Sequence, residues 1–81
     1  MAKIYARNVE GLYRNDNNGS VILCELYTTT EPDELPTNGT GIDGIGARDT
    51  FAAGCTLIAT TAKKVWMVGE DEGNFDFIKE M

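Results

Sequence analysis

The clearest β pattern in this chain lies in residues 54–77, GCTLIATTAKKVWMVGEDEGNFDF. An apolar run at 55–60 is separated by a lysine-containing turn from a second run at 65–68, and an acidic turn leads to a third run at 75–79. In the third run two phenylalanines alternate with an aspartate, which is the period of two of a strand with one buried face. This stretch therefore predicts a three-stranded antiparallel meander.

The rest of the chain divides into two further strands and a long loop. Residues 3–9 alternate weakly between apolar and polar side chains, and residues 20–27 are rich in Val, Ile, Leu and Tyr, so both segments predict strands. A polar, Asn-rich loop at 14–20 separates them. Residues 31–50 contain both prolines and four glycines, which excludes a regular helix or a central strand there, although a single helical turn at 32–35 stays open.

The length and this pattern together indicate one small all-β domain spanning residues 1–81. We expect a small antiparallel sheet or a partly open barrel that carries the C-terminal meander and the long Gly/Pro loop. Because a chain of this size buries a modest core, contact with a partner is an expected source of additional stability.

The charge balance argues against nucleic acid as a partner. The chain has 13 acidic and 7 basic residues and a formal net charge of −6, which repels a phosphate backbone. No apolar run is long enough to span a bilayer, and the N-terminal stretch MAKIYARNVEG lacks the apolar segment of a signal peptide. We therefore expect no nucleic-acid and no membrane partner, and synthesis in the cytoplasm.

Cys24 and Cys55 are the two cysteines of a chain that has no histidine. Their spacing is not that of a metal or redox motif, and no histidine is present to complete a zinc site or a Cys–His pair. We expect buried free thiols that act as small hydrophobic residues, with a disulfide in an exported particle as the alternative.

Three other patterns resemble functional motifs, and each has a simpler structural interpretation. The loop that ends at Glu25 has calcium-loop spacing, but Arg14 occupies the obligatory first ligand position. The glycine-rich stretch at 39–46 lacks the Gly-Lys-Ser/Thr end of a phosphate loop. Asp43 and Asp49 are the one pair of loop carboxylates suited to acid–base chemistry, and the simpler interpretation is that they cap turns. We expect no catalytic residue, no metal and no cofactor.

Residues 26–75 as a unit resemble small structural proteins that are encoded with the virion genes of tailed bacteriophages and prophages. Those proteins combine an LY…T..EP..LP.(T/S)G segment, a short Gly/Asp loop and a D.FA.GS.L……VYML.EDG.W segment. The matching positions here are Leu26, Tyr27, Glu31, Pro32, Leu35, Pro36, Thr37, Gly39, Asp49, Phe51, Ala52, Gly54, Val65, Trp66, Met67, Glu70 and Asp71. The chain departs from the pattern with Cys55 in place of serine, Trp66 in place of tyrosine, an extra acid at Glu72 and Phe75 in place of tryptophan.

The resemblance implies a non-enzymatic structural component of a phage particle, attached to the capsid as a decoration or head-fibre protein. It implies a location in the virion, a homo-oligomer with a trimer as one option, and a second contact with a major capsid protein or another virion protein. A tail or baseplate accessory protein and a small acidic intracellular binding module are the alternatives.

The residues expected at the oligomer or capsid interface are apolar or charged side chains of the long loop and the meander. Large aromatic rings are enriched at subunit contacts, and a loop with prolines, glycines and apolar anchors suits docking. The expected interface residues are Leu35, Ile42, Ile45, Arg48, Trp66, Val68, Phe75 and Phe77.

Overall fold

The computed structural model describes residues 3–16, 18–70 and 72–81, and this part of the chain is built from strands without a helix. Consistent with that, no helix of the described residues could cross a membrane. The strands are β1 (Ile4–Arg14), β2 (Ser20–Thr28), β3 (Ile42–Asp43), β4 (Thr50–Phe51), β5 (Thr56–Ala59), β6 (Lys64–Val68) and β7 (Phe75–Glu80). The all-β class is confirmed, whereas residues 32–35 form a bend in place of the helical turn that the sequence left open.

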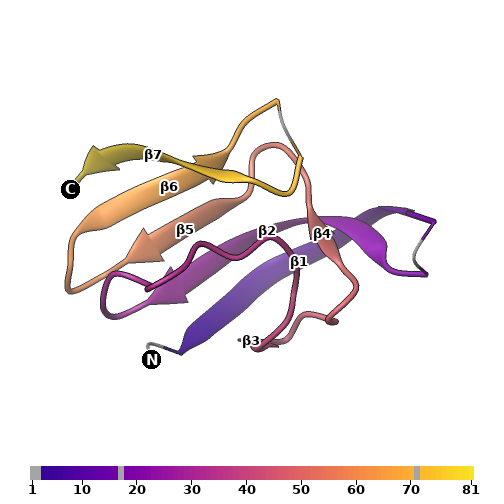
Figure 1. The fold of residues 1–81 in the computed structure, drawn as a ribbon, viewed down its shortest axis with the longest axis horizontal. Coiled ribbons are helices and arrows are strands. Elements are labelled where there is room, and N and C mark those ends of the chain that lie inside the picture. The colour runs from indigo at the N-terminus through magenta and orange to yellow at the C-terminus, as the bar shows by residue number, and fades with distance from the viewer. Residues whose placement is uncertain (1–2, 17, 71) are drawn as a thin grey trace.

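The strands form one sheet in the order β3-β1-β2-β5-β6-β7, with β4 paired to β2 beside this path (Figure 1). β5, β6 and β7 are the antiparallel meander predicted from residues 54–77, with Leu57 opposite Trp66 and Trp66 opposite Phe77. β1 and β2 form an antiparallel hairpin.

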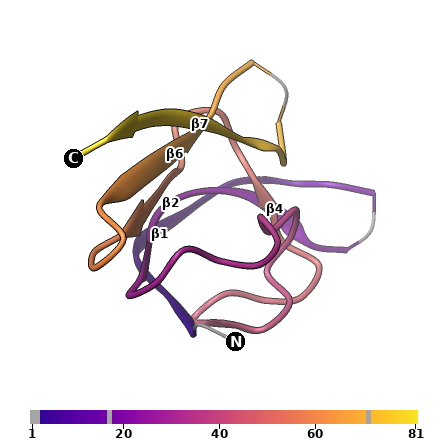
Figure 2. The same cartoon turned by 60° about the vertical axis from the view of Figure 1, so that its left-hand side comes forward.

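The sheet is open and mixed, whereas the sequence predicted a small antiparallel sheet or a partly open barrel. β2 and β5 run parallel, from Glu25 opposite Thr56 to Thr28 opposite Ala59. The parallel arrangement results from the path of the segment that connects β2 to β5. The chain leaves the end of β2, crosses one face of the sheet through residues 29–49, which we call the excursion, and re-enters beside the start of β2 (Figures 1 and 2). Parallel neighbours require such a crossover, which here is a loop instead of a helix.

The first strand is longer than the predicted residues 3–9. Irregularities in its pairing hid its second half from the sequence pattern. β1 continues to Arg14, and its pairing with β2 shifts register after Arg7 and again after Gly11. Asn8 lies in the first shift and has a left-handed backbone with φ of 54°. Bulges of this kind add a residue and increase local twist, and they disturb the alternation that marks a strand in the sequence.

The core lies between the inner face of the sheet and the excursion. Alternate residues of β2, β5 and β6 point inward, and side chains from the excursion and β4 cover them. Phe51 is fully buried and its ring meets that of Phe75 edge-on at 5.1 Å between centroids. The core residues are Ile22, Cys24, Leu26, Ile42, Phe51, Cys55, Leu57, Ala59, Trp66, Val68 and Phe75.

The excursion is held in one conformation by close backbone contacts. The Asp49 carboxylate accepts hydrogen bonds from the N–H groups of Ser20 (2.9 Å) and Gly46 (3.0 Å), and the Gly39 N–H donates to the Asp49 carbonyl (3.1 Å). A side chain at Gly39 would place its Cβ 2.0 Å from the Gly46 carbonyl oxygen, so this approach requires glycine.

Candidate functional site

The structure separates the eight expected interface residues into a buried group and an accessible group. Ile42, Trp66, Val68 and Phe75 are between 1% and 6% exposed and belong to the core. The expectation that Trp66, Val68 and Phe75 lie at an interface was therefore wrong, because these side chains are buried in the core, where Phe75 packs against Phe51 of β4. The accessible group is Leu35, Ile45, Arg48 and Phe77, of which Ile45 is half-buried against the core.

The largest exposed apolar side chains of the meander lie on and beside β7. They are Met67 at 38% exposed, Phe77 at 52%, Ile78 at 50% and Met81 at 57%. We call these four residues the β7 surface; Phe77, which pairs with Trp66, and Met67, which follows Trp66 on β6, lie on opposite faces of the sheet. Phe77 packs edge-on against Trp66 with 5.9 Å between ring centroids, so its inner side is covered while its outer side faces solvent.

β7 is also an edge of the sheet. Among the described residues β6 is the strand that pairs with it, so one side of the Phe75–Glu80 backbone faces away from the sheet. A one-residue register shift opposite Val65 and Trp66 interrupts the ladder near Ile78. An edge strand with exposed apolar side chains is a template for pairing with another chain, and bulges and lysines such as Lys79 limit uncontrolled pairing.

The excursion forms a second candidate surface. A groove of about 520 Å³ lies between it and the start of β1, with an apolar lining from Ile4, Pro32, Leu35 and Ile42. The acidic residues Asp33 and Glu34 also line this groove. The structure thus brings Leu35 and Ile42 to one groove. Arg48 lies in a different pocket of about 470 Å³, together with Thr37, Asn38, Ala47 and Thr50.

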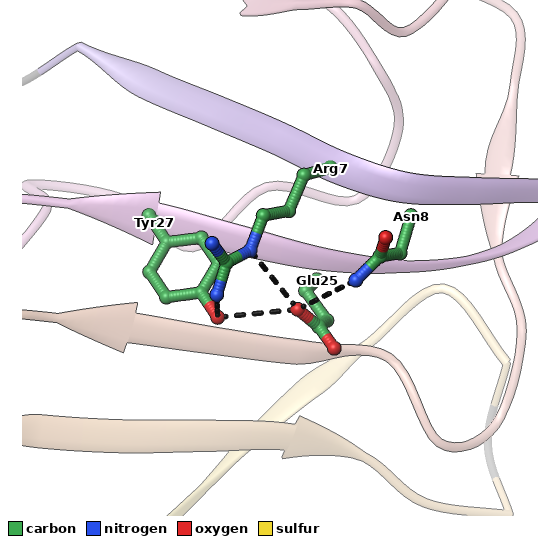
Figure 3. Close-up of polar contacts among 4 residues, drawn as sticks. All are labelled: Arg7, Asn8, Glu25 and Tyr27. Carbon is green, nitrogen blue, oxygen red and sulfur yellow. Dashed lines mark hydrogen bonds and ion pairs between the residues drawn. The ribbon is translucent and has the colours of Figure 1, made fainter.

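A polar cluster on β1 and β2 was not predicted from the sequence (Figure 3). The Arg7 guanidinium donates to the Tyr27 hydroxyl at 2.7 Å and to Glu25 at 3.2 Å, and it stacks over the Tyr27 ring at 4.5 Å from the centroid. The Asn8 side-chain amide also donates to Glu25, at 3.2 Å. These bonds raise the pKa of Arg7, chiefly through Tyr27, and lower the pKa of Glu25, chiefly through Asn8.

This cluster has the properties of a surface network. Its side chains are exposed or half-buried and satisfy one another, and none is a nucleophile with an adjacent base. Arg7 lies directly opposite Glu25 in the β1–β2 ladder. The sequence therefore contains the opposite charges of Arg7 and Glu25, but only the register of the β1–β2 ladder shows that they lie side by side.

The carboxylates considered for catalysis each have a separate partner. Asp43 forms an ion pair with Lys3 at 3.0 Å, and Asp49 holds the two backbone N–H groups described above. In the acidic turn, the Glu72 carboxylate accepts a hydrogen bond from the Tyr13 hydroxyl at 2.9 Å, while Asp71 lies outside the described residues. Within the described ranges no three His, Cys, Asp or Glu side chains form a metal-binding group.

The two cysteines are buried neighbours, and both are free thiols, as the sequence predicted. Their sulfur atoms lie 4.0 Å apart. The Cys24 thiol donates to the Cys55 sulfur, and this hydrogen bond together with burial raises the pKa of Cys24. The same bond lowers the pKa of Cys55.

Comparisons of the sequence with protein-family models and with curated proteins give no significant match, and a comparison with solved structures gives none either. The function is therefore argued from the surfaces above and from the sequence pattern of residues 26–75.

Proposed function

We propose that this chain is a non-enzymatic structural component of a bacteriophage particle, attached to the capsid as a decoration or head-fibre protein and assembled as a homo-oligomer. The observation that carries the assembly part is the β7 surface beside an open sheet edge. The assignment to a phage particle is supported by the resemblance of residues 26–75 to small virion proteins.

The β7 surface favours contact with other copies of the chain. Four large apolar side chains gather around one edge strand on a protein with a net charge of −6. An edge strand with exposed apolar side chains is a template for pairing with another chain, and burying each large side chain contributes about 1.5–3 kcal/mol. Ordering of the edge backbone by a neighbouring strand would add hydrogen bonds to this gain.

The excursion groove supports a second contact, with a capsid protein. Its apolar lining suits one or two apolar side chains of a partner, and Asp33 and Glu34 favour a basic residue beside them. Leu35, which is exposed, is the excursion side chain best placed to anchor this contact, while Ile42 shapes the floor of the groove from the core.

An assembly role also agrees with the contacts of the two carboxylates that were considered for catalysis. Asp43 and Asp49 hold the excursion in place through Lys3 and through backbone N–H groups. Groups that are saturated by structural partners are poor general acids or bases, because a catalytic group must exchange its proton with a substrate.

Quantitative mass spectrometry of purified particles tests the proposal. Heads and tails of the phage or prophage that encodes this chain are separated and the copy number of the protein is measured in each. We expect many copies in the head fraction. Recovery in the tail fraction would favour a baseplate accessory protein, and recovery solely in the cell lysate would overturn a virion role and favour an intracellular binding module.

A further inference from the structure

The cysteine pair lies at the start of the β2–β5 ladder, which joins the β1–β2 hairpin to the meander. Cys24 lies in β2, and Cys55 comes directly before β5. The parallel ladder starts with Glu25 opposite Thr56, so the cysteines face each other one position earlier. Strands lie about 4.8 Å apart, which is within the range of Cα separations that a disulfide spans.

The contacts between the two residues orient their sulfur atoms toward each other. The Cys24 backbone N–H donates to the Cys55 sulfur at 3.4 Å, and the two sulfur atoms are 4.0 Å apart. The Cys55 thiol donates in turn to the Ile22 carbonyl at 3.2 Å. A rotation of the two side chains, without a new strand arrangement, separates this geometry from a covalent bond.

We propose that Cys24 and Cys55 form a two-electron oxidation site, in which hydrogen peroxide converts the two thiols into a disulfide that links β2 to the start of β5. In the first step the Cys55 thiolate attacks peroxide, and Cys55 sulfenic acid and hydroxide form. In the second step the Cys24 sulfur displaces the sulfenic oxygen, the disulfide forms and water leaves. Overall, two thiols and one peroxide give one disulfide and two waters.

The order of the two steps follows from the hydrogen bonds. Two donors from Cys24, its backbone N–H and its thiol, point at the Cys55 sulfur and stabilise negative charge there. This makes Cys55 the first thiolate, consistent with its lowered pKa. Cys24, whose pKa is raised, stays protonated and serves as the resolving thiol.

The disulfide would lock the junction between the two halves of the sheet. Among the described residues, the β2–β5 ladder is the one strand pairing that connects β1–β4 to the β5–β7 meander. A bond between Cys24 and Cys55 would also close the covalent loop that contains the excursion. Closing such a loop restricts the unfolded chain and stabilises the fold.

Burial sets the conditions of the reaction. Both cysteines are at most 3% exposed, so peroxide reaches them through local opening of the fold. The 81-residue chain is therefore treated with hydrogen peroxide over a temperature series, denatured, and capped with maleimide. We expect an intramolecular product that has lost two hydrogens and carries no maleimide, and a melting temperature that is higher by about 10 °C or more. Dithiothreitol should reverse both changes.

Serine variants serve as matched controls. Cys24→Ser should retain sulfenic acid on Cys55, trapped by dimedone, and neither Cys24→Ser nor Cys55→Ser should gain stability from peroxide. Mass, melting shift and reversal are all read on the wild-type chain, so the test does not depend on folding of the variants. Sulfinic acid or disulfide-linked dimers as the main product would overturn the proposal, as would two maleimide-reactive thiols that persist at temperatures where maleimide labels both.

Discussion

The C-terminal meander and the excursion contribute to the same core, but they are stabilised by different means. The meander places Leu57, Trp66 and Val68 in the core through regular strand pairing, so backbone hydrogen bonds fix which side chains face inward. The excursion has one two-residue strand, and a few glycines and one carboxylate position its apolar side chains. The comparison shows that the second layer of a small β core can be an irregular loop, provided that its backbone contacts are specific.

This difference predicts that different kinds of substitution destabilise the meander and the excursion. Loss of a core side chain in the meander should cost packing energy, whereas the excursion should be sensitive to small changes in its backbone contacts.

The largest loss of stability is expected for Trp66→Ala. The indole is 5% exposed and belongs to the core, where it packs edge-on against Phe77, so its removal leaves a large cavity. The free energy of unfolding, measured by urea denaturation, should fall by about 3–5 kcal/mol. The control is Met67→Ala, one residue away on the opposite face and 38% exposed, which should cost less than about 1 kcal/mol. Equal losses would contradict the assignment of Trp66 to the core.

The next largest effect is expected for Gly39→Ala in the excursion. The added Cβ would meet the Gly46 carbonyl oxygen at 2.0 Å and Ile45 Cγ2 at 2.4 Å, so the backbone must shift. We expect a loss of about 1–3 kcal/mol in the same denaturation experiment. Gly11→Ala is the matched control, because nothing lies within 4 Å of a Cβ at that position, and it should be neutral or slightly stabilising.

A smaller loss is expected for Asp49→Ala. The substitution leaves the N–H groups of Ser20 and Gly46 without their acceptor, which should cost about 1–2 kcal/mol. Asp43→Ala removes a carboxylate from an exposed ion pair with Lys3 and should cost less than about 0.5 kcal/mol. Similar losses at the two positions would indicate that Asp49 does not organise the excursion.

The β7 surface should contribute to assembly and little to folding. Ile78 is 50% exposed, so Ile78→Asp should change the free energy of unfolding by less than about 0.5 kcal/mol while weakening self-association at least tenfold. Size-exclusion chromatography with light scattering measures the association. Val9→Asp, on exposed β1, is the control and should leave the oligomer intact. A wild-type chain that is monomeric at micromolar concentration would remove the homo-oligomer from the proposed function.

The smallest effect concerns pH and the cluster around Glu25. Its folded pKa is lowered, so ionised Glu25 stabilises the fold above its ordinary pKa of about 4.3, and this contribution is lost as pH falls through the lower, folded pKa. The melting temperature of wild type should therefore exceed that of Glu25→Gln at neutral pH, and the difference should vanish in acid. A difference that grew below pH 4 would contradict the lowered pKa.

The meander was predictable from the sequence because alternation, turn residues and strand length all agree between residues 54 and 77. The burial of Phe75 was not predictable, because its ring packs against Phe51 of β4, which lies outside the meander. Burial by a non-local segment leaves no periodic signal in either segment.

The parallel β2–β5 junction and the cysteine contact have the same origin. Both depend on where the chain re-enters after the excursion, and that point is fixed by contacts such as Gly39 with Gly46 and Asp49 with Ser20. Composition shows that residues 31–50 form a loop, but it does not determine the path of the loop. The bulges of β1, which re-aim Asn8 toward Glu25, were hidden for a similar reason.

The parallel junction also sets the order in which the fold can form. The β1–β2 hairpin and the meander each pair neighbours in the sequence, so both can form early and independently. The β2–β5 ladder joins residues from opposite ends of the excursion. Closing this long loop costs conformational entropy before the strand pairing contributes any stability. Assembly of the two halves is therefore expected to limit the folding rate. Until it occurs, the inner faces of both units and the strand edges at the junction are uncovered, which is the stage at which this chain is most prone to aggregate.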